Sequence, residues 1–126
     1  MGRVLHFEIH AEDPDRAQRF YAEVFGWSIQ PYGGPLDYRL VTTGPDGDVG
    51  INGAILKRQG PPPQDGQAVD AFVCKIGVDS IEQTERAVPA AGGRQVAQRT
   101  EVPGVGRLAY FQDTEGNLFG ALQPVT

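Results

Sequence analysis

The sequence predicts an α+β protein that repeats one small βαβββ module twice, with the helices outside and the two sheets facing a shared concave space. Three observations support this fold class. A strand pattern of period two runs into an amphipathic helix near the N-terminus, the same order of elements returns in the second half, and a proline-rich connector separates the halves. A tandem repeat of this kind determines the architecture, and ligands usually occupy such a concave space.

The opening stretch VLHFEIHA contains the first strand. Its apolar residues alternate with His6, Glu8 and His10, which is the period of a strand with one apolar face and one polar face. His6 and Glu8 should therefore face the concave space, and we expect His10, near the strand end, to be exposed.

The first helix follows directly. Asp13 is an N-cap candidate and Pro14 occupies the first helical position, while Gly26 fits the C′ position that ends the helix. Between them the apolar residues recur at helical spacing and form one stripe, namely Ala17, Phe20, Tyr21, Val24 and Phe25.

Turn-rich segments divide the rest of the chain into further short elements. A second helix should start at Asp79-Ser80 and run to Gly92, and Pro89 should make it short or kinked, because proline removes a backbone hydrogen bond. The remaining strands are expected near 27–32, 37–43, 50–57, 70–78, 95–101, 107–112 and 118–123.

The repeat sets the predicted organisation of the single domain, residues 1–126. The first module covers residues 1–58, the polar stretch QGPPPQDGQ lies in the connector 59–69, and the second module covers 70–126. Asp13 to Gly26 spans the same distance as Asp79 to Gly92. Gly53-Ala54 matches Gly120-Ala121 at nearly the same offset.

Charge and composition exclude several classes of partner. The formal charge of −5 disfavours nucleic acid and anionic membranes, which bind basic surfaces. No stretch approaches the roughly 20 apolar residues of a membrane span, and no signal sequence opens the chain. Cys74 is the only cysteine, so we expect no disulfide, a small buried side chain and a cytoplasmic location.

The chain resembles the vicinal oxygen chelate superfamily, which includes glyoxalase, bleomycin-resistance and extradiol dioxygenase proteins. The resemblance covers essentially the whole chain and lies in HFEIHAEDPDRAQRFYAEVFGW, INGAIL, GVDSIEQTERAVPAAGG and VPGVGRLAYFQDTEGNLFGALQ. It implies a U-shaped, partly closed eight-stranded sheet with the helices outside, and a homodimer.

Metal-dependent members of this family place ligands on the first and fourth strands of each module. By this resemblance the matching positions here are His6, Gly53, Val73 and Gly120, so one ligand of four remains. A catalytic zinc needs about three protein ligands, and side chains spaced two apart along one strand do not converge easily on one ion. We therefore expect no metal and no other cofactor.

The candidate site residues are polar or aromatic side chains on the predicted strands. His6 and Glu8 are an acid/base pair or a polar anchor for ligand, or two polar residues satisfied by neighbouring groups. Lys75 should face the same space and form an ion pair with Glu8. Small residues after Asn52 allow close approach by a ligand or tight strand packing. The ligand-binding residues that we predict are His6, Glu8, Tyr38, Asn52, Lys75 and Tyr110.

The predicted function is binding of a small organic molecule in the cavity between the modules, without a metal. Two alternatives stay open. One is a metal-dependent lyase or dioxygenase that uses His6, and the other is a metal-free enzyme in which His6 or Glu8 moves a proton. No catalytic residue is assigned, because this fold supports many chemistries.

Overall fold

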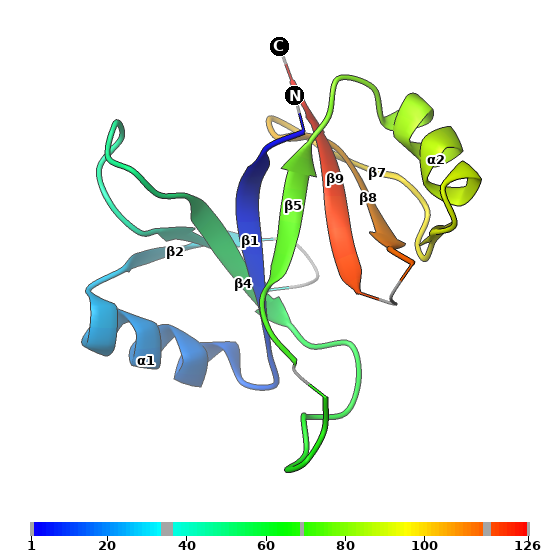
Figure 1. Ribbon diagram of the computed structural model, residues 1–126. Coiled ribbons are helices and arrows are strands. Elements are labelled where there is room, and N and C mark those ends of the chain that lie inside the picture. Colours follow the sequence, from blue (N-terminus) through cyan, green and yellow to red (C-terminus); the bar gives the residue numbers. More distant parts are fainter. Residues whose placement is uncertain (1, 34–36, 69, 115–116, 126) are drawn as a thin grey trace. The chain divides into compact units, whose positions relative to one another are not determined.

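The computed structural model describes residues 2–33, 37–68, 70–114 and 117–125. It confirms the α+β class and the two βαβββ modules (Figure 1). The chain divides into two compact units. One unit is His6–Phe72, and the other combines the residues up to Leu5 with Val73–Thr126.

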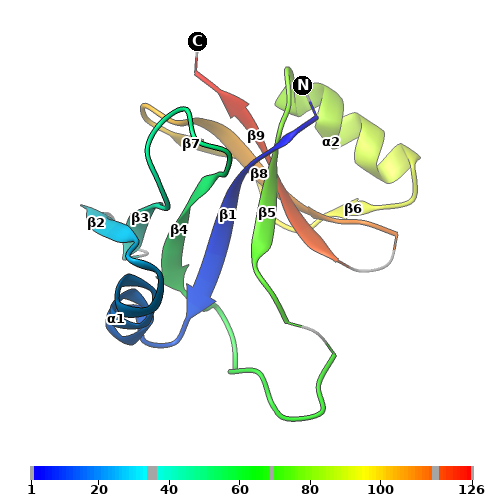
Figure 2. The ribbon, with the colours of Figure 1, turned by 60° about the vertical axis from the view of Figure 1, so that its left-hand side comes forward.

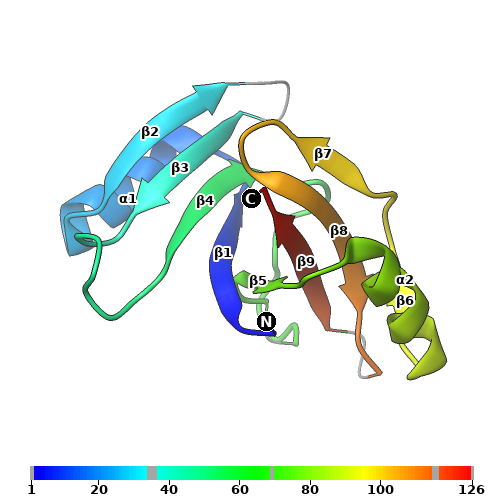
Figure 3. The same cartoon turned by 90° about the horizontal axis from the view of Figure 1, so that it is seen from above.

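The first unit is a four-stranded sheet with one helix. Its strands follow the order β2-β3-β4-β1, in which β1 pairs with β4 in parallel and the other pairs are antiparallel. Helix α1 lies along one face of this sheet (Figure 3). The elements are β1 (Val4–Ala11), α1 (Pro14–Phe25), β2 (Ser28–Gly33), β3 (Tyr38–Thr42) and β4 (Asn52–Lys57).

Helix α1 begins and ends where the sequence predicts. The Asp13 side chain accepts a hydrogen bond from the Arg16 backbone N–H at 3.1 Å, and Pro14 occupies the first turn. Gly26 takes the left-handed conformation with φ 73° and donates to the Ala22 carbonyl, so a residue without a Cβ is favoured there.

The core of the first unit lies between α1 and the apolar face of the sheet. Trp27 packs against this core and stacks on Tyr21 with ring centroids 5.0 Å apart. The helix buries only part of its apolar stripe. The buried core residues are Phe7, Ile9, Ala11, Ile29, Val41 and Ile55, with Ala17, Tyr21 and Trp27 packed against them.

Arg39 links α1 to β3 through an ion pair and hydrogen bonds. Its guanidinium lies 2.8 Å from the Asp15 carboxylate and donates to the Gln18 side chain at 2.8 Å and to Asp37. The hydrogen bond with Asp37 is the main reason that the pKa of Arg39 is raised and that the pKa of Asp37 is lowered.

The second unit repeats the plan, with α2 packed on a sheet of order β5-β9-β8-β6 and with β7 also paired to β8 (Figure 2). The N-terminal residues belong here, because Gly2 donates to the Gly77 carbonyl at 2.7 Å and Gly77 donates to the Arg3 carbonyl at 2.8 Å. The elements are β5 (Val73–Gly77), α2 (Ile81–Ala90), β6 (Arg94–Gln95), β7 (Thr100–Val102), β8 (Gly106–Gln112) and β9 (Leu118–Pro124).

One predicted strand, near 95–101, is split into β6 and β7. Gln95 pairs with Phe111 and Thr100 pairs with Leu108. The chain therefore advances by five residues from β6 to β7 while β8, opposite, advances by three. The two extra residues interrupt the ladder as a bulge does, and the described chain therefore contains nine strands rather than eight.

Helix α2 is short, as Pro89 predicts. Ser80 is its N-cap and accepts from the Gln83 backbone N–H at 3.1 Å, and the helix ends one residue after Pro89. Cys74 is exposed, so the prediction of a buried thiol was wrong. On β5 the buried residues alternate with Cys74, so this short strand buries only one of its faces.

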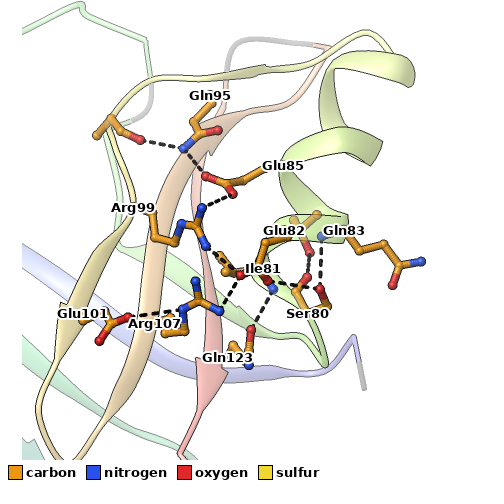
Figure 4. A network of polar contacts seen from close by, with 12 residues as sticks. Ser80, Ile81, Glu82, Gln83, Glu85, Gln95, Arg99, Glu101, Arg107 and Gln123 are labelled. Atoms are coloured by element: carbon orange, nitrogen blue, oxygen red, sulfur yellow. Dashed lines mark hydrogen bonds and ion pairs between the residues drawn. The ribbon is translucent and has the colours of Figure 1, made fainter.

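A network of charged side chains joins the start of α2 to β7 and β8 (Figure 4). The Glu82 carboxylate lies 2.7 Å from the Arg99 guanidinium and 2.5 Å from that of Arg107, and Arg99 also approaches Glu85 at 3.4 Å. Arg107 is 3.6 Å from Glu101, which is an ion pair without a hydrogen bond.

Within the described ranges, no helix is both long and apolar enough to cross a membrane.

Candidate functional site

Four of the six predicted ligand-binding residues lie on one face of the first unit's sheet. In the β1–β4 ladder His6 stands beside Asn52 and Glu8 beside Ala54. Leu40 of β3 pairs with the same Ala54, and Tyr38 is two residues before Leu40. Side chains in register or two apart share a face, so this face carries His6, Glu8, Tyr38 and Asn52. We call it the polar face.

The polar face contains two close pairs of polar side chains. The Tyr38 hydroxyl and His6 Nε2 lie 3.4 Å apart, near the limit for a hydrogen bond. His10 Nε2 donates to the Glu8 carboxylate at 3.1 Å. The first pair joins β1 to β3, while the second lies within β1.

Glu8 is the most deeply buried ionisable residue of the first unit, with 1% of its surface exposed. A buried carboxylate is costly unless it is hydrogen-bonded, and His10 supplies one bond here. The imidazole of His10 keeps 26% exposure. A ligand could therefore reach His10 from solvent while Glu8 holds the ring in place.

Sequence reasoning missed His10, which we expected to be exposed at the strand end. The structure shows it part-buried and bonded to Glu8. The alternation along β1 already placed both residues on one face, but it did not show that the two side chains meet.

Asn52 has a structural role in the first unit. Its side-chain oxygen accepts from the Thr43 backbone N–H at 2.9 Å and lies 3.3 Å from the Thr43 hydroxyl. These contacts join the end of β3 to the start of β4, so Asn52 offers a ligand mainly its amide nitrogen.

The assignment of Gly53 to a metal-ligand position on the face of His6 was wrong. Gly53 pairs with Phe7, on the opposite face, and a Cβ there would lie 2.5 Å from the Phe7 ring and 2.6 Å from its carbonyl oxygen. Tight strand packing, the structural interpretation, therefore explains this glycine. The β4 residues on the side of His6 are Asn52 and Ala54.

The other two predicted residues, Lys75 and Tyr110, flank Gly120 in the second unit. Lys75 pairs with Gly120 across β5 and β9, and Tyr110 pairs with it across β8 and β9. A Cβ on Gly120 would stand 3.1 Å from the Lys75 side chain and 3.3 Å from the Tyr110 ring. The glycine thus leaves room for both side chains, and Lys75 keeps 3% exposure. The ion pair of Lys75 with Glu8 stays a prediction.

Among the residues with described positions, no three His, Cys, Asp or Glu side chains group so that they could hold a metal ion. His6 lies beside Tyr38, and Glu8 bonds His10. The part of the site that is described therefore offers hydrogen-bonding groups rather than a convergent ligand set.

Comparison with known proteins supports the resemblance seen in the sequence. Residues 3–44 match the family model described as bleomycin resistance protein-like N-terminal. A glyoxylase-like domain-containing protein of Didymella fabae is 31% identical over 119 residues, which cover 92% of this chain and 89% of that protein. CFP32 of Mycobacterium bovis, which carries a glyoxylase name, is 30% identical over 98% of this chain, which spans 44% of CFP32.

Solved structures share the fold at low sequence identity. A methylmalonyl-CoA epimerase in complex with methylmalonyl-CoA and NH4+ has a TM-score of 0.72 at 14% identity, covering 100% of this chain and 96% of the epimerase chain. A glyoxalase/bleomycin resistance protein/dioxygenase superfamily member from Vibrio splendidus has a TM-score of 0.61 at 18% identity, covering 99% and 100% of the two chains.

Proposed function

Because this chain belongs to the vicinal oxygen chelate superfamily, with glyoxalase-like and bleomycin-resistance-like relatives, we propose that it binds a small organic molecule on the polar face without a metal ion. The observation that carries the proposal is the buried Glu8 carboxylate, held by His10 next to the His6–Tyr38 pair.

The side chains of the polar face suggest the kind of ligand. Beside the polar pairs, the same face carries the exposed side chain of Leu40, and Ala54 and Leu56 are buried beneath it. Apolar walls with a few polar groups are typical of small-molecule sites. We propose a ligand with an apolar body and one group that hydrogen-bonds to His6, Tyr38 or His10.

The first experiment is a measurement of metal content by mass spectrometry on untagged protein, followed by calorimetric titration of zinc, nickel, manganese and ferrous iron into wild type and His6→Ala. We expect less than stoichiometric metal and no binding heat that depends on His6. Stoichiometric metal that is lost in His6→Ala would contradict the proposal and favour the metal-dependent lyase or dioxygenase that uses His6.

Ligand binding is tested with a panel of aromatic and branched aliphatic acids and with acyl-CoA esters. Tyr38→Phe and His6→Ala should weaken binding about 10-fold, because each removes one hydrogen bond of about 1 kcal/mol or more at the site. Tyr21→Phe is the matched control, since Tyr21 packs on the opposite, helix-covered face. Equal affinity in wild type and both site variants would refute binding on the polar face.

A second candidate function is a metal-free enzyme, which the Glu8–His10 contact favours. A carboxylate that orients an imidazole is a common arrangement for moving protons. Glu8→Gln should then abolish turnover of a bound ligand while affinity is retained. Unchanged turnover in this variant would refute a proton-transfer role for Glu8.

We also propose that the protein is a homodimer, as the family resemblance implies. We propose further that it is located in the cytoplasm. Its single cysteine is exposed, and such a thiol is kept reduced most readily in the cytosol.

A further inference from the structure

Helix α1 carries an apolar stripe that its own sheet does not cover. Phe20 and Val24 are 54% and 56% exposed, whereas Ala17 and Tyr21 pack against the core. Phe20 and Val24 are four residues apart, so they are neighbours on the helix surface. Large apolar side chains that gather on one surface are typical of interaction sites.

The charges beside the stripe are unusual for an isolated helix. Arg16 and Arg19 lie in its N-terminal half and Glu23 in its last turn, and all three are exposed. Arg16 in the first turn and Glu23 in the last turn oppose the preference of the helix dipole for acidic residues at the start and basic ones at the end, whereas Asp13 and Asp15 follow it. In the described part of the chain, none of these three charged groups makes a hydrogen bond or ion pair. Stability of α1 alone therefore does not explain them.

We propose that α1 docks on α1 of a second copy of this chain, with the two helices antiparallel about a twofold axis. The pattern is self-complementary, as a twofold contact requires. An axis near Ala22 sets Phe20 of one copy against Val24 of the other, and it brings Arg19 of each helix close to Glu23 of its partner. Arg19 then meets Glu23 twice.

A second copy fits these observations better than an unrelated partner does. An unrelated partner would have to supply both charges in the reverse order beside an apolar stripe, whereas a second α1 does so by symmetry. The inference rests on the proposed homodimer and is independent of the proposed ligand.

The test is the dimer dissociation constant, Kd, measured by sedimentation equilibrium on the full chain. Arg19→Glu and Glu23→Arg should each raise Kd about 10-fold or more, because each sets like charges together at two symmetric places. The double variant should restore Kd to within about threefold of wild type, because it reverses both members of each pair. Phe20→Ser should weaken the dimer about 100-fold.

The controls separate association from folding. Val49→Lys changes a fully exposed valine outside the helix and should leave Kd unchanged. Circular dichroism at concentrations below Kd should show the same helix content for every variant. A monomeric wild type would overturn both the homodimer and the α1 interface. If the charge reversals leave the dimer Kd unchanged, or if the double variant does not recover the wild-type Kd, only the α1 interface would be overturned.

Discussion

Glu8 and His10 show what the alternation along β1 could predict about single residues. The period of two placed His6, Glu8 and His10 on one face, and the register with β4 supports this for the described residues. The pattern did not show that His10 turns toward Glu8, because hydrogen bonds along one strand depend on side-chain rotamers that sequence spacing does not determine.

Gly53 was placed on the wrong face because the match between the modules is offset by one residue. The two ladders show that Ala54, beside Glu8, corresponds to Gly120, beside Lys75. A slip of one residue along a strand moves a side chain to the opposite face. Spacing along the sequence does not resolve a slip of this size.

Replacing Gly53 by alanine should destabilise the first unit by about 1–3 kcal/mol, because the added methyl group meets the Phe7 ring and carbonyl oxygen within 2.6 Å. Urea unfolding measures the change. Gly44→Ala is the matched control, since a Cβ at Gly44 meets nothing within 4 Å, and it should stay within about 0.5 kcal/mol of wild type. Equal stability of the two variants would mean that Phe7 does not pack against Gly53.

At the scale of an element, the attachment of α2 should depend on pH through Glu82. The Glu82 backbone N–H first, and then the hydrogen-bonded Arg107 guanidinium, lower the pKa of this carboxyl from 4.5 to about 2. A carboxyl with a lowered folded pKa stabilises the fold above its unfolded pKa and loses that effect as pH falls. We therefore expect Glu82→Gln to lower Tm at pH 7, and the difference from wild type to shrink between about pH 4.5 and 2.

Thermal unfolding from pH 7 to pH 2 checks this expectation. Glu12→Gln is the control, because Glu12 is exposed and its substitution should give a small, pH-independent difference in Tm. If the difference in Tm between Glu82→Gln and wild type persists unchanged to pH 2, the negative charge of the Glu82 carboxylate does not stabilise the packing of α2.

The elements themselves were largely predictable. Asp13, Pro14 and Gly26 fix the limits of α1 by local chemistry, and Pro89 explains why α2 stops early. The division between β6 and β7 was not predictable, because a bulge depends on how two strands pair. The network around Glu82 likewise joins residues from separate elements, and no local pattern identifies it.

At the scale of the whole molecule, the order of elements and the repeat followed from periodicity and turns. The division into units did not, because it falls inside β1, between Leu5 and His6. The strand pattern continues without interruption across that point, so the sequence has no boundary there to detect.

Removal of residues 1–5 should therefore loosen the second unit rather than the first. The Gly77 amide donates to Arg3 in the intact chain, and its hydrogen exchange should accelerate about fivefold or more when this bond is lost. The Arg58 amide, which donates to Ala11 in the first unit, serves as the control. Wild-type exchange at Gly77 in the shortened chain would contradict this assignment.

The position of that boundary within β1 also bears on how the chain can be divided. A cut in the connector after β4 would leave the first fragment holding the N-terminal residues that pair with Gly77 of the second. Cutting the connector therefore does not separate the two compact units, because residues 1–5 of the second unit stay with the first fragment. We therefore expect the second fragment to be more stable when residues 2–5 are returned to it, either in trans as a peptide or by a permutation that places them at its own end.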